Sequence, residues 1–286
     1  MNTLESRQGN VMDRPLVSVI MGIYNCERTL KEAILSIQEQ TYQNWEMIMC
    51  DDGFSDHTSD IAEEYQRSDP DKYTLIRNER NMGLNYTLNR CLELAKGKYI
   101  ARMDGDDIST KDRFAKEVEF LEAHPELAIV SSRMQMFDEN GVWGESRIFE
   151  RPQIKDFCRK SSIFCHAASM IRADAFREVG GYTVDPKLLR VEDCHLWYKM
   201  YAKGYRGANL PEVLYSMRND RLAVSRRTAQ NRLNLIYVTW GGYHMVKMPW
   251  YNYIHFARVV LTEISKIIIP GKVYEILYKH KYRTTD

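Results

Sequence analysis

Acidic side chains gathered in two short clusters are the residues of this sequence with the clearest chemical potential. Asp51 and Asp52 form one cluster, and Asp104, Asp106 and Asp107 form the other. Like charges this close repel, so such clusters persist where a cation or hydrogen-bond donors compensate them. Mg²⁺ and Mn²⁺ prefer oxygen ligands, often carboxylates combined with phosphates and water. The residue types therefore indicate a metal–phosphate site, and the alternative is a solvated acidic loop that caps the next helix.

Both clusters follow segments with the pattern of buried strands. Apolar and β-branched residues predict strands at Val17–Tyr24, Trp45–Cys50, Tyr73–Arg77 and Lys98–Met103, and Leu127–Ser131 is a further apolar run. Helical spacing and turn residues predict helices at Thr29–Gln40, Ser55–Arg67, Asn85–Lys96 and Thr110–Ala123. This alternation predicts an α/β protein with a mostly parallel open sheet flanked by helices. Ligands of such sheets bind outside the carboxyl ends of the strands, where both acidic clusters fall.

The second half of the chain is less regular. Phe137–Gly141 is expected to form a turn between two strands, and the apolar run Ile163–Ile171 is interrupted by His166. Short helical patterns occur at Phe176–Val179 and Glu192–Ala202. This part of the sequence therefore extends the domain without a clear continuation of the strand–helix alternation.

Composition places the chain among soluble globular proteins. Hydrophobic residues make up 44% and charged residues 28% of its 286 residues, which suits one large domain or one domain with an appendage. The six cysteines include no C-x-x-C pair, so we expect buried free thiols and a reducing compartment. The first residues lack the apolar region of a signal peptide, and no apolar run reaches the ~20 residues that span a bilayer. These features predict a cytoplasmic protein.

The net charge of +1 is unevenly distributed. Residues 221–286 hold 11 Lys/Arg against 3 Asp/Glu, a net charge of +8, whereas residues 1–220 hold 29 against 36, a net charge of −7. An acidic body and a basic tail indicate different partners for the two parts.

Several motifs occur in an order that resembles the family 2 glycosyltransferases, whose nucleotide-binding half has the GT-A fold. In chain order they are VSVIMGIYN, DDGFSDHT at 51–58, N-x-G-L at 81–84, DGDD at 104–107, a histidine before an apolar strand, GGY at 180–182 and E-D-x-x-L-W at 192–197. The resemblance covers roughly residues 15–230. It implies a GT-A domain at 15–220, with a nucleotide-binding half at 15–110 and an acceptor half at 111–220, followed by a helical extension at 221–286.

The resemblance also implies which residues bind the nucleotide-sugar donor. Tyr24 and the backbone around Gly22 would flank the nucleobase, and Asp52 would accept a hydrogen bond from it. Asp104 would lie near the ribose, and Asp106 would coordinate the Mg²⁺ or Mn²⁺ ion that bridges the diphosphate. Further donor contacts are expected from two motif residues, Asn25 and Asn81.

The same resemblance assigns the reaction chemistry to Asp193, with Glu192 beside it. Asp193 would act as general base on the acceptor hydroxyl, in a single displacement that inverts the anomeric configuration. The alternative is a helix N-terminus that favours acidic residues. His166 would line the acceptor or diphosphate side, and the alternative is a histidine packed in the core.

One position departs from the family pattern. Family members often carry Y-R-x-H-x-x-S-x-S near Met217–Ser225, and Asp220 stands in the place of the histidine. A carboxylate can also ligate Mg²⁺ or Mn²⁺, so Asp220 is a candidate metal ligand, or else a loop residue without that role. Arg226 and Arg227 are candidates for compensating charge on the diphosphate side.

The tail combines aromatic, basic and amphipathic features. Seven of the 20 residues from Tyr237 to Phe256 are aromatic, and apolar residues then recur at helical spacing from Ile254 to Ile268. Such segments lie in membrane interfaces and are attracted to anionic headgroups. The alternative is a helix docked on the domain or on another subunit. No nucleic-acid recognition motif accompanies the basic charge, so nucleic acid is not an expected partner.

The expected function is inverting transfer of a sugar, from a nucleotide-diphosphate donor with UDP favoured, to a hydroxyl of a lipid-linked saccharide in surface polysaccharide synthesis. Peripheral attachment to the cytoplasmic face of the membrane would suit this acceptor. A sugar nucleotidyltransferase is an alternative, but its Gly-rich phosphate loop is absent from GIYNCERT at 22–29, which has one glycine. A dehydrogenase would need G-x-G-x-x-G after the first strand, which is absent. A non-catalytic binding subunit with the same fold is the other alternative.

Overall fold

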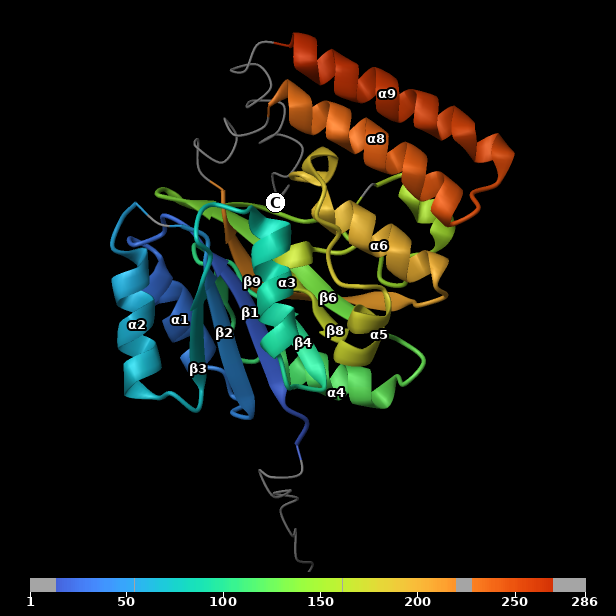
Figure 1. Cartoon of the computed structure of the whole chain (residues 1–286). Helices are drawn as coiled ribbons and strands as arrows, with labels where there is room; N and C mark the ends of the chain where they lie inside the picture. The colour runs from blue at the N-terminus through green and yellow to red at the C-terminus, as the bar shows by residue number, and fades with distance from the viewer. Residues whose placement is uncertain (1–13, 54, 161, 220–227, 270–286) are drawn as a thin grey trace, which may run out of the picture.

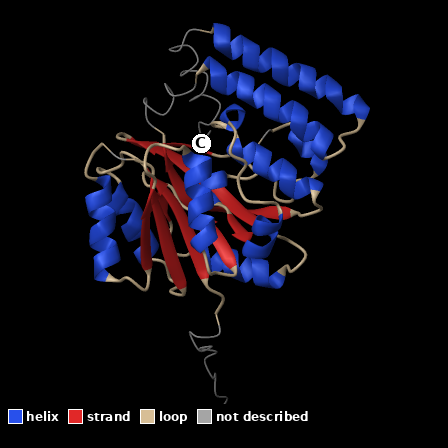
Figure 2. Cartoon of the chain, in the orientation of Figure 1, coloured by secondary structure: helices blue, strands red, loops and turns tan. Residues whose placement is uncertain are grey.

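A computed structural model describes residues 14–53, 55–160, 162–219 and 228–269. Within them one nine-stranded sheet runs through the molecule, with helices against both of its faces (Figures 1 and 2). The strands are β1 (Val17–Ile23), β2 (Trp45–Asp51), β3 (Tyr73–Arg77), β4 (Tyr99–Arg102), β5 (Ile108–Ser109), β6 (Ile129–Asp138), β7 (Gly141–Glu145), β8 (Met170–Arg172) and β9 (Gly207–Arg218).

The strand order is β3-β2-β1-β4-β8-β6-β9-β5, and β7 pairs with β6. Strands β1 to β4 pair in parallel, β6 and β9 also pair in parallel, and the three antiparallel strands are β5, β7 and β8. All seven residues of β2 are buried, as expected for a parallel strand covered on both faces. The predicted α/β class with a mostly parallel open sheet is confirmed.

Helices pack on the sheet in two groups. The helices before the C-terminal part are α1 (Leu30–Gln38), α2 (Thr58–Ser68), α3 (Leu84–Leu94), α4 (Arg113–Ala123), α5 (Ala173–Glu178) and α6 (Glu192–Ala202). One apolar cluster joins the sheet to α1, α2 and α4, and the other joins it to α3, α5 and α6. The predicted alternation of strands and helices is therefore confirmed, with boundaries displaced by a few residues.

The long strand β9 was not predicted from the sequence. It pairs with β6, but the register between them shifts where Ser132 pairs with Leu210 and Arg133 pairs with Val213. Pro211 and Glu212 lie in this irregularity, where proline, which cannot donate to the ladder, is tolerated. The interruption also hides the strand pattern in the sequence.

Two further helices, α8 (Ala229–Met245) and α9 (Tyr253–Ile268), follow the sheet. Helix α8 packs on α6 and α9 packs on α8, so the C-terminal part forms a helical hairpin outside α6 (Figure 1). Gly242 allows the close approach of α8, because a Cβ atom there would lie 2.2 Å from the ring of Tyr198. The predicted C-terminal helical extension is confirmed, whereas its boundary at 220/221 stays a prediction. No helix in the described ranges is long and apolar enough to cross a membrane.

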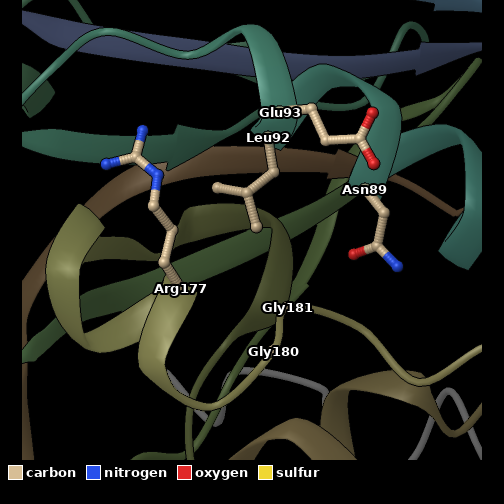
Figure 3. A pocket seen from close by; sticks show the side chains of 6 residues that line it. All are labelled: Asn89, Leu92, Glu93, Arg177, Gly180 and Gly181. Carbon is tan, nitrogen blue, oxygen red and sulfur yellow. The ribbon is translucent and has the colours of Figure 1, made fainter.

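The six cysteines are all free, and both Cys50 and Cys91 are buried, as predicted. A surface depression of about 430 Å³ lies between α3 and the turn after α5 (Figure 3). None of the residues predicted to carry chemistry lines it. Its walls are formed by Asn89, Leu92, Glu93, Arg177, Gly180 and Gly181.

Candidate active site

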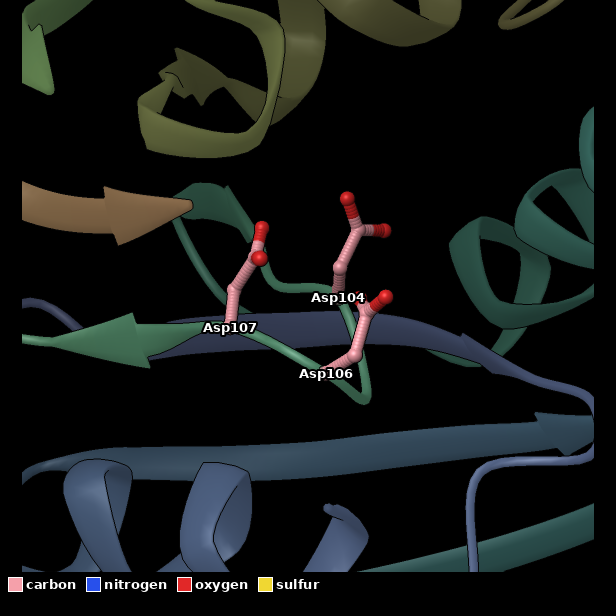
Figure 4. Close-up of side chains that lie close together, drawn as sticks. All are labelled: Asp104, Asp106 and Asp107. Atoms are coloured by element: carbon pink, nitrogen blue, oxygen red, sulfur yellow. The ribbon is translucent and has the colours of Figure 1, made fainter. Parts of the chain in front are cut away.

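Three aspartates converge in the loop that follows β4. Asp104, Asp106 and Asp107 each offer a carboxylate oxygen, and these oxygens lie within 4.8 Å of one another. Figure 4 shows the three side chains rising from one loop toward the same side. Asp104 and Asp106 are half-buried and Asp107 is buried, so the cluster is open on one side to water or phosphate. This donor set fits a hard divalent cation.

The charges of the cluster support the same interpretation. The pKa of Asp107 lies well above its ordinary value because of burial, and the neighbouring charges of Asp104 and Asp106 raise it further. A cation bound among the three carboxylates would relieve this repulsion and hold all three ionised.

Two arginines hold the cluster in place. Arg102, which is 6% exposed, binds the two carboxylate oxygens of Asp104 through Nη2 and Nη1, at 2.7 and 2.8 Å. At the end of β9, the backbone N–H of Arg218 donates to Asp107 Oδ1 at 2.8 Å and its Nε donates to the carbonyl of Asp106 at 3.0 Å. A bidentate arginine fixes the orientation of a carboxylate as well as balancing its charge. The sequence pattern did not assign a role to either arginine.

Asp52 fixes the loop that follows β3. Its carboxylate accepts hydrogen bonds from Asn78 Nδ2 at 2.8 Å, from the backbone N–H of Met82 at 2.7 Å and from that of Gly83 at 2.9 Å. A carboxylate offers about four acceptor positions, so capacity remains for one donor from a ligand. The neighbouring Gly53 has a φ of +81°, and a Cβ atom there would lie 2.8 Å from the backbone nitrogen of Asn81. The backbone of the loop after β3 therefore lies too close to position 53 for any residue that has a side chain there.

Asn81 lies in the loop after β3, and three other residues predicted to bind the donor lie at the end of β1 or just after it. Tyr24 is exposed, whereas Gly22 packs against Leu84 and Thr87 at the start of α3. Asn25 has a φ of +48°, and its Oδ1 accepts hydrogen bonds from the backbone N–H and the hydroxyl of Ser55. Asn25 therefore links the loop after β1 to the loop after β2.

A second carboxylate pair begins helix α6. The Ser162 hydroxyl donates to Asp193 Oδ2 at 2.6 Å, which orients this half-buried carboxylate. Burial, and after it the charge of Asp193, raise the pKa of Glu192 to about 7 against the opposing charge of Arg102. Arg102 therefore acts electrostatically on Glu192 while it binds Asp104, so one residue of each acidic group faces a common cation.

His166 lies beside the same arginine. Its Nε2 is in hydrogen-bond contact with the Tyr182 hydroxyl at 2.7 Å, and its ring lies edge-on to Trp197. Burial, and then the charge of Arg102, hold the pKa of His166 well below its ordinary range. The imidazole is therefore neutral at physiological pH and available as a polar, uncharged contact. Two other predicted site residues, Asp220 and Arg226, lie outside the described residues, as does Arg227.

Taken with the strand order, these carboxylates define the class of protein, a glycosyltransferase with the GT-A fold. The chain belongs to glycosyl transferase family 2, whose model matches residues 18–180. The resemblance found in the sequence is confirmed, whereas the roles of individual residues stay predictions.

Individual relatives agree with this assignment. The chain is 42% identical to the glycosyltransferase EpsE of Bacillus subtilis (strain 168), over 91% of this chain and 94% of the relative. It is 29% identical to an Escherichia coli protein named UDP-Gal:alpha-D-GlcNAc-diphosphoundecaprenol beta-1,3-galactosyltransferase, over 95% and 98% of the two chains. Among solved structures, the mannosyltransferase PcManGT from Pyrobaculum calidifontis matches with a TM-score of 0.65 at 19% identity, over 94% of this chain and 80% of that one. At this identity the match shows the fold alone.

Proposed function

We propose that the protein transfers a sugar, with inversion, from a UDP-sugar to a hydroxyl group of a lipid-linked saccharide. The observation that carries this proposal is that Asp104 of the three-aspartate cluster and Glu192 of the α6 pair both act on the charge of Arg102. One group suits the charged donor and the other suits proton transfer from an acceptor. The E. coli relative, named for UDP-Gal and a diphosphoundecaprenol-linked sugar, supports this choice of substrates.

Asp106 is the proposed principal ligand of a Mg²⁺ or Mn²⁺ ion, with Asp104 toward the ribose and Asp220 as a further candidate ligand. The presence of Mn²⁺ and GDP-Man in the PcManGT structure supports a divalent ion of this kind. When bound, the ion supplies neutralisation of the charge that develops on the departing diphosphate. Arg218 keeps Asp106 and Asp107 in place through the backbone contacts described above.

The nucleobase is proposed to bind between Tyr24 and the loop that Asp52 holds. The exposed ring of Tyr24 offers a stacking surface, and the free acceptor position of Asp52 suits a base N–H. Gly22, Asn25 and Asn81 complete this side of the donor site through backbone and loop geometry.

Asp193 is the proposed general base. Ser162 occupies one oxygen of its carboxylate, which leaves the other oxygen to accept the proton of the acceptor hydroxyl as that hydroxyl attacks the anomeric carbon. Attack from the side opposite the diphosphate inverts the anomeric configuration. Glu192 and the neutral His166 are proposed to line the acceptor or diphosphate side, and Arg226 to add positive charge there.

A lipid-linked acceptor places the reaction at a membrane surface. We therefore assign the protein to the cytoplasmic face of the membrane as a peripheral protein, in surface polysaccharide synthesis. The reducing environment suited to its free cysteines supports this location.

Replacing Asp193 with Asn tests the proposal. Turnover should fall by about 100-fold or more while donor affinity stays normal, because only the proton acceptor is lost. Turnover is measured as UDP release from UDP-sugars with a GlcNAc-diphospho-lipid acceptor and Mn²⁺. Asp71→Asn, at an exposed position, is the matched control. Unchanged turnover in Asp193→Asn with normal donor binding would show that the base is another residue.

The same assay separates the two rival functions. A non-catalytic subunit would bind UDP-sugars without releasing UDP under any acceptor condition. A nucleotidyltransferase would instead release pyrophosphate from UTP and a sugar phosphate, with no dependence on a lipid acceptor.

A further inference from the structure

The α8–α9 hairpin carries an apolar surface that the domain leaves uncovered. On α9 the exposed apolar residues recur on one side of the helix, and three of them, Ile254, Leu261 and Ile268, are 74%, 70% and 76% exposed. Ala257 and Ile264 lie on the same stripe, at helical spacing. We call these five residues the outer stripe.

A neighbouring side of α9 is already occupied by α8. Tyr253 and Phe256 pack against Trp240 of α8, with ring centroids 5.6 and 5.2 Å apart. The outer stripe is therefore not the face that holds the hairpin together. Its exposed apolar side chains serve no packing purpose within the described chain.

Exposed aromatic side chains lie in the turn between the two helices, just before the outer stripe begins. Trp250 is 85% exposed and Tyr251 is also exposed, in the short turn that precedes α9. Tryptophan and tyrosine favour the interface between water and lipid, because one end of each ring is apolar and the other polar.

The charges beside the stripe are of one sign. Between residues 228 and 269 the sole acidic residue is Glu263, which is 4% exposed and is paired with Arg232 at 3.1 Å and with Lys266. Lys247 and Arg258 are exposed. The hairpin therefore presents positive charge with no accessible carboxylate, which complements an anionic surface.

The hairpin also lies near the site in the fold. Figure 1 places α8 and α9 at the end of the molecule toward which the parallel strands β1 to β4 run, which is the end that carries the aspartate cluster. Strand β9 ends at Arg218, which contacts that cluster, and α8 is the next helix among the described residues. A surface bound by the hairpin would therefore lie beside the active site.

We propose that the outer stripe, Trp250 and Tyr251 dock in the interface of an anionic lipid bilayer and hold the active site beside its lipid-linked acceptor. The 16 residues of α9 span about 24 Å, which is shorter than the hydrocarbon core, so the helix lies in the plane of the interface. The bilayer docking stands on the hairpin alone, whereas its benefit to transfer rests on the proposed function.

Vesicle sedimentation of the full chain tests the docking. Wild-type protein should bind vesicles of phosphatidylcholine with phosphatidylglycerol, bind vesicles of phosphatidylcholine alone more weakly, and be released by high salt. Leu261→Asp should weaken binding to the anionic vesicles by about tenfold, because one apolar contact is lost and a negative charge is added. Leu35→Asp on α1, also an exposed leucine within a helix, is the matched control and should bind like wild type.

Two further measurements make the outcome decisive. Equal vesicle binding by wild type and Leu261→Asp would overturn the proposal. Light scattering gives a second test. If wild type is a dimer, and Leu261→Asp is a monomer with unchanged vesicle binding, the stripe joins two copies of this chain and the proposal is overturned. UDP release with a detergent-solubilised acceptor should be equal in wild type and Leu261→Asp, so loss of docking is distinguished from failure of the proposed reaction.

Discussion

Glu192 and Asp193 are adjacent carboxylates that differ in their surroundings. Ser162 hydrogen-bonds Asp193, whereas Glu192 lies in a more desolvated position with a pKa raised to about 7. A carboxyl group whose pKa is raised by burial beside another carboxylate is common where proton transfer occurs. At the scale of the residue, the pair therefore combines an oriented proton acceptor with a neighbour that titrates near neutrality.

This raised pKa predicts a pH-dependent stability effect. Because the folded protein holds the Glu192 proton more tightly than the unfolded chain does, the contribution of Glu192 to stability is present below its ordinary pKa of 4.5 and is lost as the pH rises through about 7. Glu192→Gln should therefore raise the free energy of unfolding by about 3 kcal/mol at about pH 8 and change it little at about pH 4. Urea denaturation at the two pH values measures this, and an equal effect at both would contradict it.

Arg102 shows what residue patterns alone could not predict. The carboxylates it serves were found from their clustering and motif order, but Arg102 lies within the apolar segment KYIARM and resembles an ordinary strand residue. Its importance comes from burial and from the approach of α6 to the end of β4, neither of which is encoded near it in the chain. The acidic members of the site could be predicted, whereas the cation between them required the fold.

Tyr182, in the turn that follows α5, is held in place by a residue of α3. Asn89 of α3 donates to the carbonyl of Tyr182 at 2.7 Å and accepts the Tyr182 N–H at 2.8 Å. Gly181 permits this contact with a φ of +58°, because a Cβ atom there would lie 2.6 Å from Asn89 Oδ1. At the scale of the element, the G-G-Y motif joins α3 to the side of the site that holds His166.

Two glycine substitutions in this turn separate steric contact from backbone strain. Gly180 also has a positive φ, of +73°, but a Cβ atom there would meet nothing within 4 Å. Gly180→Ala should cost about 1 kcal/mol from backbone conformation, and Gly181→Ala about 1–2 kcal/mol more from the clash with Asn89. Chemical denaturation of both variants measures the difference. Equal destabilisation would show that the Asn89 contact does not constrain the turn.

The elements themselves were predictable to different degrees. Strands β1 to β4 and helices α1 to α4 follow their apolar periodicity because each contacts its sequence neighbours in the sheet. The bulge at Pro211–Glu212 breaks the pattern of β9, and its pairing partner β6 is distant in the sequence. The sequence pattern therefore predicted strands β1 to β4, whereas the pairing of β6 with β9 became visible only in the structure.

Across the whole molecule, charge and shape divide the protein into two functional surfaces. The aspartate cluster lies at one end of the sheet, and the basic α8–α9 hairpin lies at that same end (Figure 1). The division was visible in the sequence as opposite net charges of residues 1–220 and 221–286. What the fold adds is the proximity of the aspartate cluster and the α8–α9 hairpin, on which the proposed binding of a charged donor beside an anionic surface depends.

The central claim is that Asp106 and its neighbours bind a divalent ion together with a nucleotide-diphosphate sugar. Isothermal titration of UDP-sugars into wild type and Asp106→Asn, with Mn²⁺ or with a chelator, tests this most directly, and thermal unfolding checks that the variant is folded. Wild type with Mn²⁺ should bind one donor tightly. At a donor concentration of about 100 times the Kd, the free energy of unfolding should rise by about 2.7 kcal/mol. Asp106→Asn and chelated wild type should lose that binding. Donor affinity that is the same in all three samples would contradict the account.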